Sequence, residues 1–179
     1  MIRPSATAFV FAALLSAAAA LAGCSSSESL PEGIPSFYRD LATSDAVVDA
    51  AAAKSMISGY RANNGLGPVT LDPELMKMAA DQARVMAAKD KLDHSAGRPF
   101  QDRIQQSGFD AGVAVENIGA GYHTLAEAFS GWRDSPPHRA NMLNNQVTKM
   151  GIAAAYSPQS KYKVFWSLIL AAPDEHHRG

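Results

Sequence analysis

The chain of 179 residues contains a single cysteine, Cys24, so it cannot form an internal disulfide. It also has no excess of charge, because 16 basic residues face 17 acidic ones. A nearly neutral surface gives no electrostatic basis for binding nucleic acid. The common catalytic signatures are absent too: there is no Gly-x-Ser-x-Gly elbow, His-Glu-x-x-His pair, phosphate-binding loop or dinucleotide-binding glycine run. Without disulfides, the hydrophobic core must stabilise the fold. Any function must depend on residues outside these common catalytic motifs.

The first residues contain an apolar run, residues 6–21, which follows Arg3 and ends in Leu-Ala-Gly-Cys at residues 21–24. A charged start, an apolar centre and small residues before a cut are typical of a secretory leader; the alternative is a hydrophobic anchor. The small residues before Cys24 resemble the processing site of bacterial lipoproteins. That resemblance implies a lipid on Cys24, and two or more acyl chains would hold the protein stably on a membrane.

We therefore expect four segments. Residues 1–23 form the signal peptide, and their removal from the 179 leaves 156 residues, enough for one domain. Residues 24–37 carry the lipidated cysteine and a Ser-, Pro- and Gly-containing flexible tether. Residues 38–173 form the folded domain. Residues 174–179 form a disordered tail. Its two adjacent histidines could bind a metal ion weakly, but we favour a frayed chain end.

Alternating helix and strand patterns fill the domain. Helical spacing predicts helices at residues 47–64, from residue 72 onward and at 99–107, and a capping box predicts another from Thr124 to about Arg133. A short strand is expected at 113–115, and a hairpin from 149–156 and 162–170. We interpret Phe129, Trp132 and Trp166 as core residues. Together these elements predict an α+β fold in which helices flank a small, mainly antiparallel sheet.

Three polar residues are the strongest candidates for a site: His94, Glu116 and His138. If they converge, two imidazoles and a carboxylate could hold Zn or another divalent cation, with His94 and His138 as ligands. Without metal they could form a polar cluster in which Glu116, if its pKa is raised by burial, acts as a general base. Ser135 is interpreted as a helix cap in preference to a nucleophile, and Asn141 either borders the site or holds the turn.

Several motifs, in order and at characteristic spacing, identify a family resemblance. They are YRANNGL at residues 60–66, LDPEL at 71–75, LDHS at 92–95, ENI at 116–118, WRDSPPHRANML at 132–143 and MGI at 150–152. Residues 47–172 resemble the CAP superfamily of cysteine-rich secretory, antigen 5 and pathogenesis-related 1 proteins, specifically its bacterial SCP-like branch. The resemblance implies a three-layer α-β-α sandwich.

The chain departs from this family at two positions. Members outside bacteria commonly carry two His and two Glu around a cavity, and His94 and Glu116 match the first of each. Ser135 stands where the second Glu is expected and Phe165 where the second His is expected. Bacterial members resemble this chain in having His138, which could replace the lost imidazole across the cleft formed with Ser135 and Asn141.

The resemblance implies several functions without choosing among them. The family is associated with divalent-metal binding, with sterol and lipid binding, and with secreted interaction roles. We expect an extracytoplasmic ligand-binding or interaction module, non-enzymatic and anchored to the bacterial envelope membrane through Cys24, with a lipid, sterol, peptide or protein partner and none among nucleic acids. The alternative is a metal-assisted hydrolase in which His94 and His138 hold the ion and Glu116 activates water.

Overall fold

The computed structural model describes residues 33–175, so the predicted leader, Cys24 and the tail histidines His176 and His177 lie outside the described part of the chain. Of the predicted tether, only residues 33–37 are described. They lead into a short 3₁₀ turn, η1 (Ser36–Tyr38), whose Phe37 packs against the core. Within the described residues no helix is both long and apolar enough to cross a membrane.

A four-stranded sheet with the order β1-β3-β4-β2 forms the middle of the domain. β3 (Lys149–Tyr156) and β2 (Ala111–Ala120) both pair antiparallel with β4 (Val164–Pro173). The two-residue β1 (Thr70–Leu71) adds a parallel edge and is too short for a sequence pattern to predict. The sheet is therefore small and mainly antiparallel, as expected.

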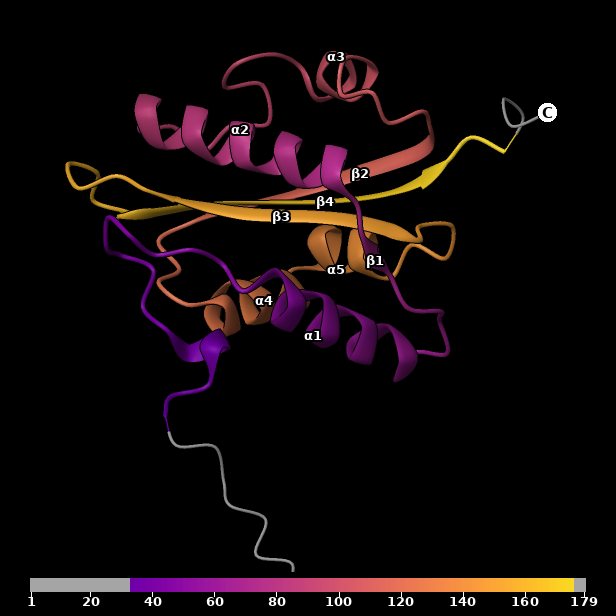
Figure 1. Ribbon diagram of the computed structural model, residues 1–179, viewed down its shortest axis with the longest axis horizontal. Helices are drawn as coiled ribbons and strands as arrows, with labels where there is room; N and C mark the ends of the chain where they lie inside the picture. Colours follow the sequence, from indigo (N-terminus) through magenta and orange to yellow (C-terminus); the bar gives the residue numbers. More distant parts are fainter. Residues whose placement is uncertain (1–32, 176–179) are drawn as a thin grey trace, which may run out of the picture. The chain divides into compact units, whose positions relative to one another are not determined.

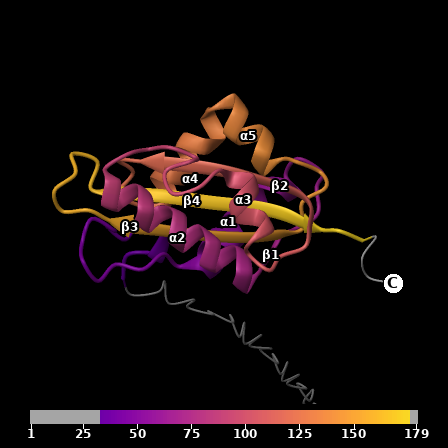
Figure 2. The ribbon, with the colours of Figure 1, turned by 90° about the horizontal axis from the view of Figure 1, so that it is seen from above.

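Helices cover both faces of the sheet (Figure 1). α2 (Pro73–Lys89) and α3 (Phe100–Gln105) lie on one face. α1 (Ala50–Ala62), α4 (Leu125–Asp134) and α5 (Pro136–Met142) lie on the other. This arrangement confirms the α+β fold and the three-layer α-β-α sandwich. Seen from above, α5 lies beside the β2 edge of the sheet (Figure 2). The helix that carries His138 is therefore next to the strand that carries Glu116.

Local signals in the sequence set the helix ends. Asp72 accepts hydrogen bonds from the backbone of Glu74 and Leu75 and so caps α2, whose first residue is a proline. Thr124 and Glu127 form the expected capping box of α4. The second strand of the hairpin starts at residue 164, later than predicted, because Lys163 has a left-handed backbone with φ 61° that interrupts the ladder.

One prediction about β2 is wrong in a way that affects the site. The sequence suggested a strand of three residues, 113–115, with Glu116 at its end. β2 instead runs on to Ala120, because its backbone stays paired with β4 as far as Phe165. Glu116 therefore lies in the middle of a rigid strand, opposite Ile169.

The core fills both interfaces between helices and sheet. Trp132 and Trp166 are fully buried on the α1, α4 and α5 side and meet edge to face, with ring centroids 6.3 Å apart. Phe129 is partly buried beside them, so the interpretation of these aromatics as core is confirmed. On the other face, α2 approaches β3 so closely that a Cβ on Gly151 would lie 2.1 Å from the carbonyl carbon of Leu75. That contact fixes α2, and with it the start of the loop that carries His94.

Candidate functional site

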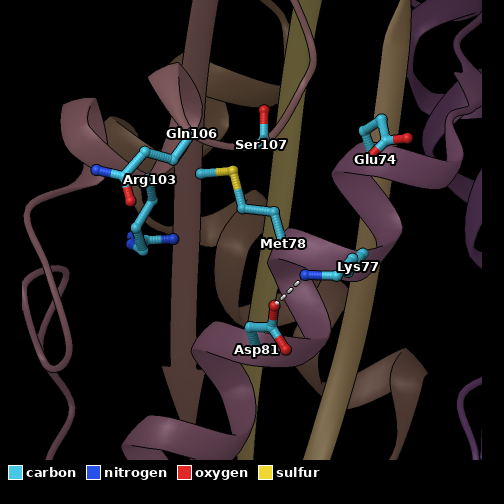
Figure 3. Close-up of a pocket in the computed structure, with 7 residues that line it drawn as sticks. All are labelled: Glu74, Lys77, Met78, Asp81, Arg103, Gln106 and Ser107. Atoms are coloured by element: carbon cyan, nitrogen blue, oxygen red, sulfur yellow. Dashed lines mark hydrogen bonds and ion pairs between the residues drawn. The ribbon is translucent and has the colours of Figure 1, made fainter.

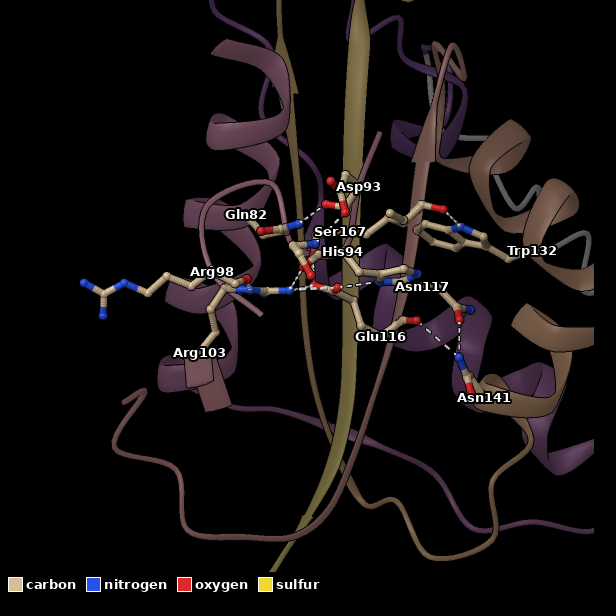
Figure 4. Close-up of polar contacts among 12 residues, drawn as sticks. Gln82, Asp93, His94, Arg98, Arg103, Glu116, Asn117, Trp132, Asn141 and Ser167 are labelled. Atoms are coloured by element: carbon tan, nitrogen blue, oxygen red, sulfur yellow. Dashed lines mark hydrogen bonds and ion pairs between the residues drawn. The ribbon is translucent and has the colours of Figure 1, made fainter. Parts of the chain in front are cut away.

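The carboxylate of Glu116 is the centre of the polar cluster (Figure 4). Its side chain is 1% exposed and points to the sheet face covered by α2 and α3. Ser167 on the neighbouring strand β4 donates a hydrogen bond to Oε1 over 3.2 Å. A buried carboxylate is costly unless its charge is compensated and its oxygens accept hydrogen bonds. The rest of the cluster meets both requirements.

Arg103 on α3 supplies the compensating charge. Its Nη2 donates to Glu116 Oε1 at 3.0 Å and to Oε2 at 2.9 Å, and also to the backbone carbonyl of His94 at 2.9 Å. The guanidinium carbon lies 5.3 Å from the centroid of the Phe100 ring, and the side chain is 10% exposed. The sequence patterns gave no prediction of this role. The available signal was an arginine three residues after Phe100 and next to Ile104, on the apolar stripe of a short helix.

His94 joins the cluster from the loop between α2 and α3. Its Nδ1 donates to Glu116 Oε2 over 2.8 Å, while 52% of the side chain remains exposed. The hydrogen bond with the Glu116 carboxylate raises the pKa of His94 above its ordinary value, although partial burial acts against this shift. The backbone of the loop is held twice, because Gln82 Nε2 donates to the carbonyl of Asp93 and Arg103 donates to that of His94.

His138 forms a second, separate pair. It lies in the first turn of α5, and its Nδ1 is 3.0 Å from Ser135 Oγ. Ser135 is the N-cap residue of α5, as expected, and its carbonyl accepts from the backbone of Arg139, but its side chain makes no capping hydrogen bond. The hydroxyl pairs with the imidazole instead. Burial lowers the pKa of His138, and the nearby charge of His94 lowers it further.

Two asparagines connect these pairs along the edge of β2 that pairs with no other strand. Asn141 Nδ2 donates to the carbonyl of Glu116 over 3.2 Å and to Asn117 Oδ1 over 2.8 Å. Asn117 Nδ2 in turn donates to the carbonyl of His138 over 2.9 Å. Asn141 thus holds the turn and borders the cluster at once. The first of these bonds satisfies a backbone carbonyl that β2, as an edge strand, cannot pair with another strand.

The two departures from the family pattern have clear structural results. Phe165 is fully buried and packs edge to face against Tyr162, with centroids 5.9 Å apart. It lies beside Ile118 in the core, so it adds packing where an imidazole was expected. Ser135 pairs with His138, and within residues 33–175 that imidazole bonds to Ser135 rather than to Glu116.

This arrangement does not fit the expected divalent metal. Both oxygens of Glu116 already accept hydrogen bonds from Arg103, and His94 directs its Nδ1 proton at the same carboxylate. In the described part of the chain, no three His, Cys, Asp or Glu side chains are grouped so that they could hold one ion. The convergence of His94, Glu116 and His138 into one metal site, as the sequence suggested, is therefore not found.

A cavity of about 200 Å³ lies on the outer side of the cluster, between α2 and the segment that begins with α3 (Figure 3). Its lining is Glu74, Lys77, Met78, Asp81, Arg103, Gln106 and Ser107. Of the residues that contact the Glu116 carboxylate, only Arg103 lines it. Lys77 and Asp81 form an exposed ion pair on its α2 side.

Comparison with known proteins agrees with this architecture. The Bacillus subtilis protein YkwD is 31% identical over 125 residues, which are 62% of this chain and 48% of YkwD, so the chain spans about half the length of that relative. An extracellular protein containing an SCP domain from Bacillus anthracis has a TM-score of 0.60 at 23% identity, over 68% of this chain and 39% of the other. An outer surface protein from Borrelia burgdorferi has a TM-score of 0.63 at 18% identity, over 72% of this chain and 98% of the other.

At these identities the two structures support the fold alone. The family itself is shown by residues 54–170, which match the cysteine-rich secretory protein family, CAP, over more than half of the chain. The chain therefore belongs to the CAP family.

Proposed function

We propose that this protein is a lipid-anchored, extracytoplasmic interaction module of the bacterial cell envelope, which binds its partner through the loop between α2 and α3. The observation that carries the proposal is the rigid placement of this loop. Gln82 and Arg103 hold the carbonyls of Asp93 and His94, yet Leu92 and the His94 ring stay about half exposed. A rigid scaffold that presents exposed apolar and aromatic side chains is typical of a binding surface.

The polar cluster supports binding over hydrolysis. A general base must be free to accept a proton from water. Both oxygens of Glu116 instead accept hydrogen bonds within the fold, and the side chain is almost completely buried. The cluster is thus arranged to fix the loop. The ligand we expect is a lipid, a sterol, a peptide or a segment of a partner protein that covers Leu92 and His94.

The proposed location agrees with that of two proteins of similar fold, although the proposal rests on the leader and Cys24. The Bacillus anthracis structure is that of an extracellular protein and the Borrelia burgdorferi structure that of an outer surface protein. The leader and Cys24 provide the means of attachment. In cell fractionation, the full chain should stay with the membranes and show an acyl mass increment, whereas Cys24→Ser should be released without it. Ser26→Ala is the matched control and should behave as the wild type. Membrane retention of Cys24→Ser equal to that of the wild type would refute the anchor.

The binding surface has its own test. The full chain in detergent is titrated with a fluorescent fatty acid, a fluorescent sterol and a pool of unstructured peptides, and surface crosslinking in cells reports protein partners. Leu92→Ser and His94→Ala should weaken the interaction that is found, whereas Lys54→Ala on α1, on the opposite face of the sheet, should not. An interaction that is equally strong in all variants would place the binding surface elsewhere.

A further inference from the structure

The family resemblance implies a divalent metal in this cleft, but the fold already places a cation at the Glu116 carboxylate. Arg103 Nη2 lies within 3.0 Å of both oxygens of Glu116, and one nitrogen bridges the carboxylate and the carbonyl of His94. The guanidinium therefore links the His94 loop to the Glu116 carboxylate without any bound ion.

We propose that Arg103 is the built-in cation of the Glu116 site: it replaces a divalent metal, closes the site to metal ions and fixes the His94 loop. The conformation of the loop that presents Leu92 and His94 then does not depend on a bound metal ion. This inference concerns how the site is stabilised, and it can fail while the proposed binding function holds.

Electrostatics and ligand chemistry both disfavour a metal ion bound at the Glu116 carboxylate. A zinc ion bonds to a carboxylate oxygen at about 2.0–2.2 Å, which would place it against the guanidinium that contacts the same oxygens. The repulsion between a dication and a buried guanidinium is strong, since little water separates them. The Nδ1 nitrogen of His94 donates its proton to Oε2, so this nitrogen has no lone pair for an ion at the carboxylate, and the Nε2 lone pair lies on the other side of the ring from Glu116.

The surroundings of Arg103 also fit a permanent role. Arginine keeps its charge across the whole physiological pH range, so Glu116 is compensated under all such conditions. The Phe100 ring lies against the guanidinium and favours a planar, weakly hydrated cation over a compact ammonium. Ser167 completes the shell around the carboxylate from β4. Side chains of the protein therefore supply both the compensating charge and the hydrogen-bond donors of the Glu116 carboxylate.

The test is a calorimetric titration of the full chain in detergent with Zn²⁺ alone. The tail pair His176 and His177 could bind zinc weakly, so every titration is repeated with His94→Ala to isolate the contribution of the site. Wild type and His94→Ala should give the same isotherm. Arg103→Met should gain a site of 1:1 stoichiometry that is lost in Arg103→Met/His94→Ala, with an affinity at least about tenfold above that of the wild type. Arg103→Lys, which keeps the charge, should not gain it.

A second measurement on the wild type covers the case in which Arg103→Met does not fold. Nitrogen-detected NMR of the arginine side chains should show Arg103 guanidinium protons that exchange slowly and do not shift when zinc is added. Zinc binding in the wild type that depends on His94, a zinc-induced shift of the Arg103 signals, or a folded Arg103→Met without a new site would each overturn the proposal. Identical isotherms together with unmoved Arg103 signals would support it.

Discussion

A double-mutant cycle on Arg103 and Glu116 tests whether these two residues form one electrostatic unit. Both side chains are at most 10% exposed, and one guanidinium nitrogen contacts both carboxylate oxygens. Arg103→Met leaves an unpaired buried carboxylate, and Glu116→Leu leaves an unpaired buried guanidinium. Removing one partner of a buried ion pair typically costs about 3–5 kcal/mol of unfolding free energy. We expect each single variant to lose that amount.

The double variant should lose much less than the sum of the two. Replacing a buried ion pair by apolar residues of similar volume is often neutral or stabilising, so the loss of the two charges together removes the penalty that each single variant carries. His94 and Ser167 lose their acceptor in the double variant, which offsets part of this gain, at about 1 kcal/mol per hydrogen bond. The double variant should therefore be no less stable than either single variant.

Urea denaturation, followed by tryptophan fluorescence from the buried Trp132 and Trp166, measures these differences. Asp81→Leu together with Lys77→Met is the matched control, because Asp81, with its partners Lys77 and Arg84, lies on the exposed surface of α2. It should change stability by less than about 1 kcal/mol, with little coupling. Additive losses at Arg103 and Glu116, so that the double variant unfolds most easily, would refute the interpretation of these residues as one unit.

Further predictions concern packing and pH. Gly151→Ala should destabilise the domain by at least about 1–3 kcal/mol, because its Cβ would overlap the backbone of Leu75, whereas Gly59→Ala in α1 meets no atom within 4 Å and should stabilise it by about 0.5–1 kcal/mol in thermal unfolding. The raised pKa of His94 means that its stabilising contribution is present below the ordinary histidine pKa and is lost as pH rises through the folded-state pKa. The lowered pKa of His138 gives the opposite sign, since its contribution is lost as pH falls. Urea titrations of His94→Ala and His138→Ala between about pH 5 and 8, the range in which histidine titrates, should therefore deviate from the wild type in opposite directions, and parallel pH profiles would contradict both assignments.

Sequence patterns predicted the elements of this fold well where the signal is local. Asp72 with Pro73 and Thr124 with Glu127 satisfy helix ends by short-range hydrogen bonds, so the starts of α2 and α4 could be read directly. The length of β2 could not, because its last residues stay extended through pairing with β4, a strand much later in the chain. Long-range pairing leaves no mark on a local pattern of Gly and Ala.

The same distinction applies to the candidate site. The sequence correctly joined His94 with Glu116, because the family motifs name both residues. It expected His138 to bond in the same group, but α5 turns that imidazole to Ser135, three residues earlier on the same turn. It missed Arg103 because an arginine on a short amphipathic helix normally lies on the solvated face. Only the packing of α3 against β2 shows that this side chain points inward to Glu116.

In this chain, residue type alone is therefore a poor guide to the chemistry around Glu116. Two chains can share the His and Glu of the motif and still differ in function, since a carboxylate beside a metal ion can activate water, whereas a carboxylate bound to arginine mainly stabilises its surroundings. In this chain the residue bound to the carboxylate is Arg103. It lies thirteen positions before the Glu it compensates and outside every motif that identifies the family. The charge that faces Glu116 from α3 should therefore indicate, more reliably than the motif residues, whether a related domain can bind metal at this place.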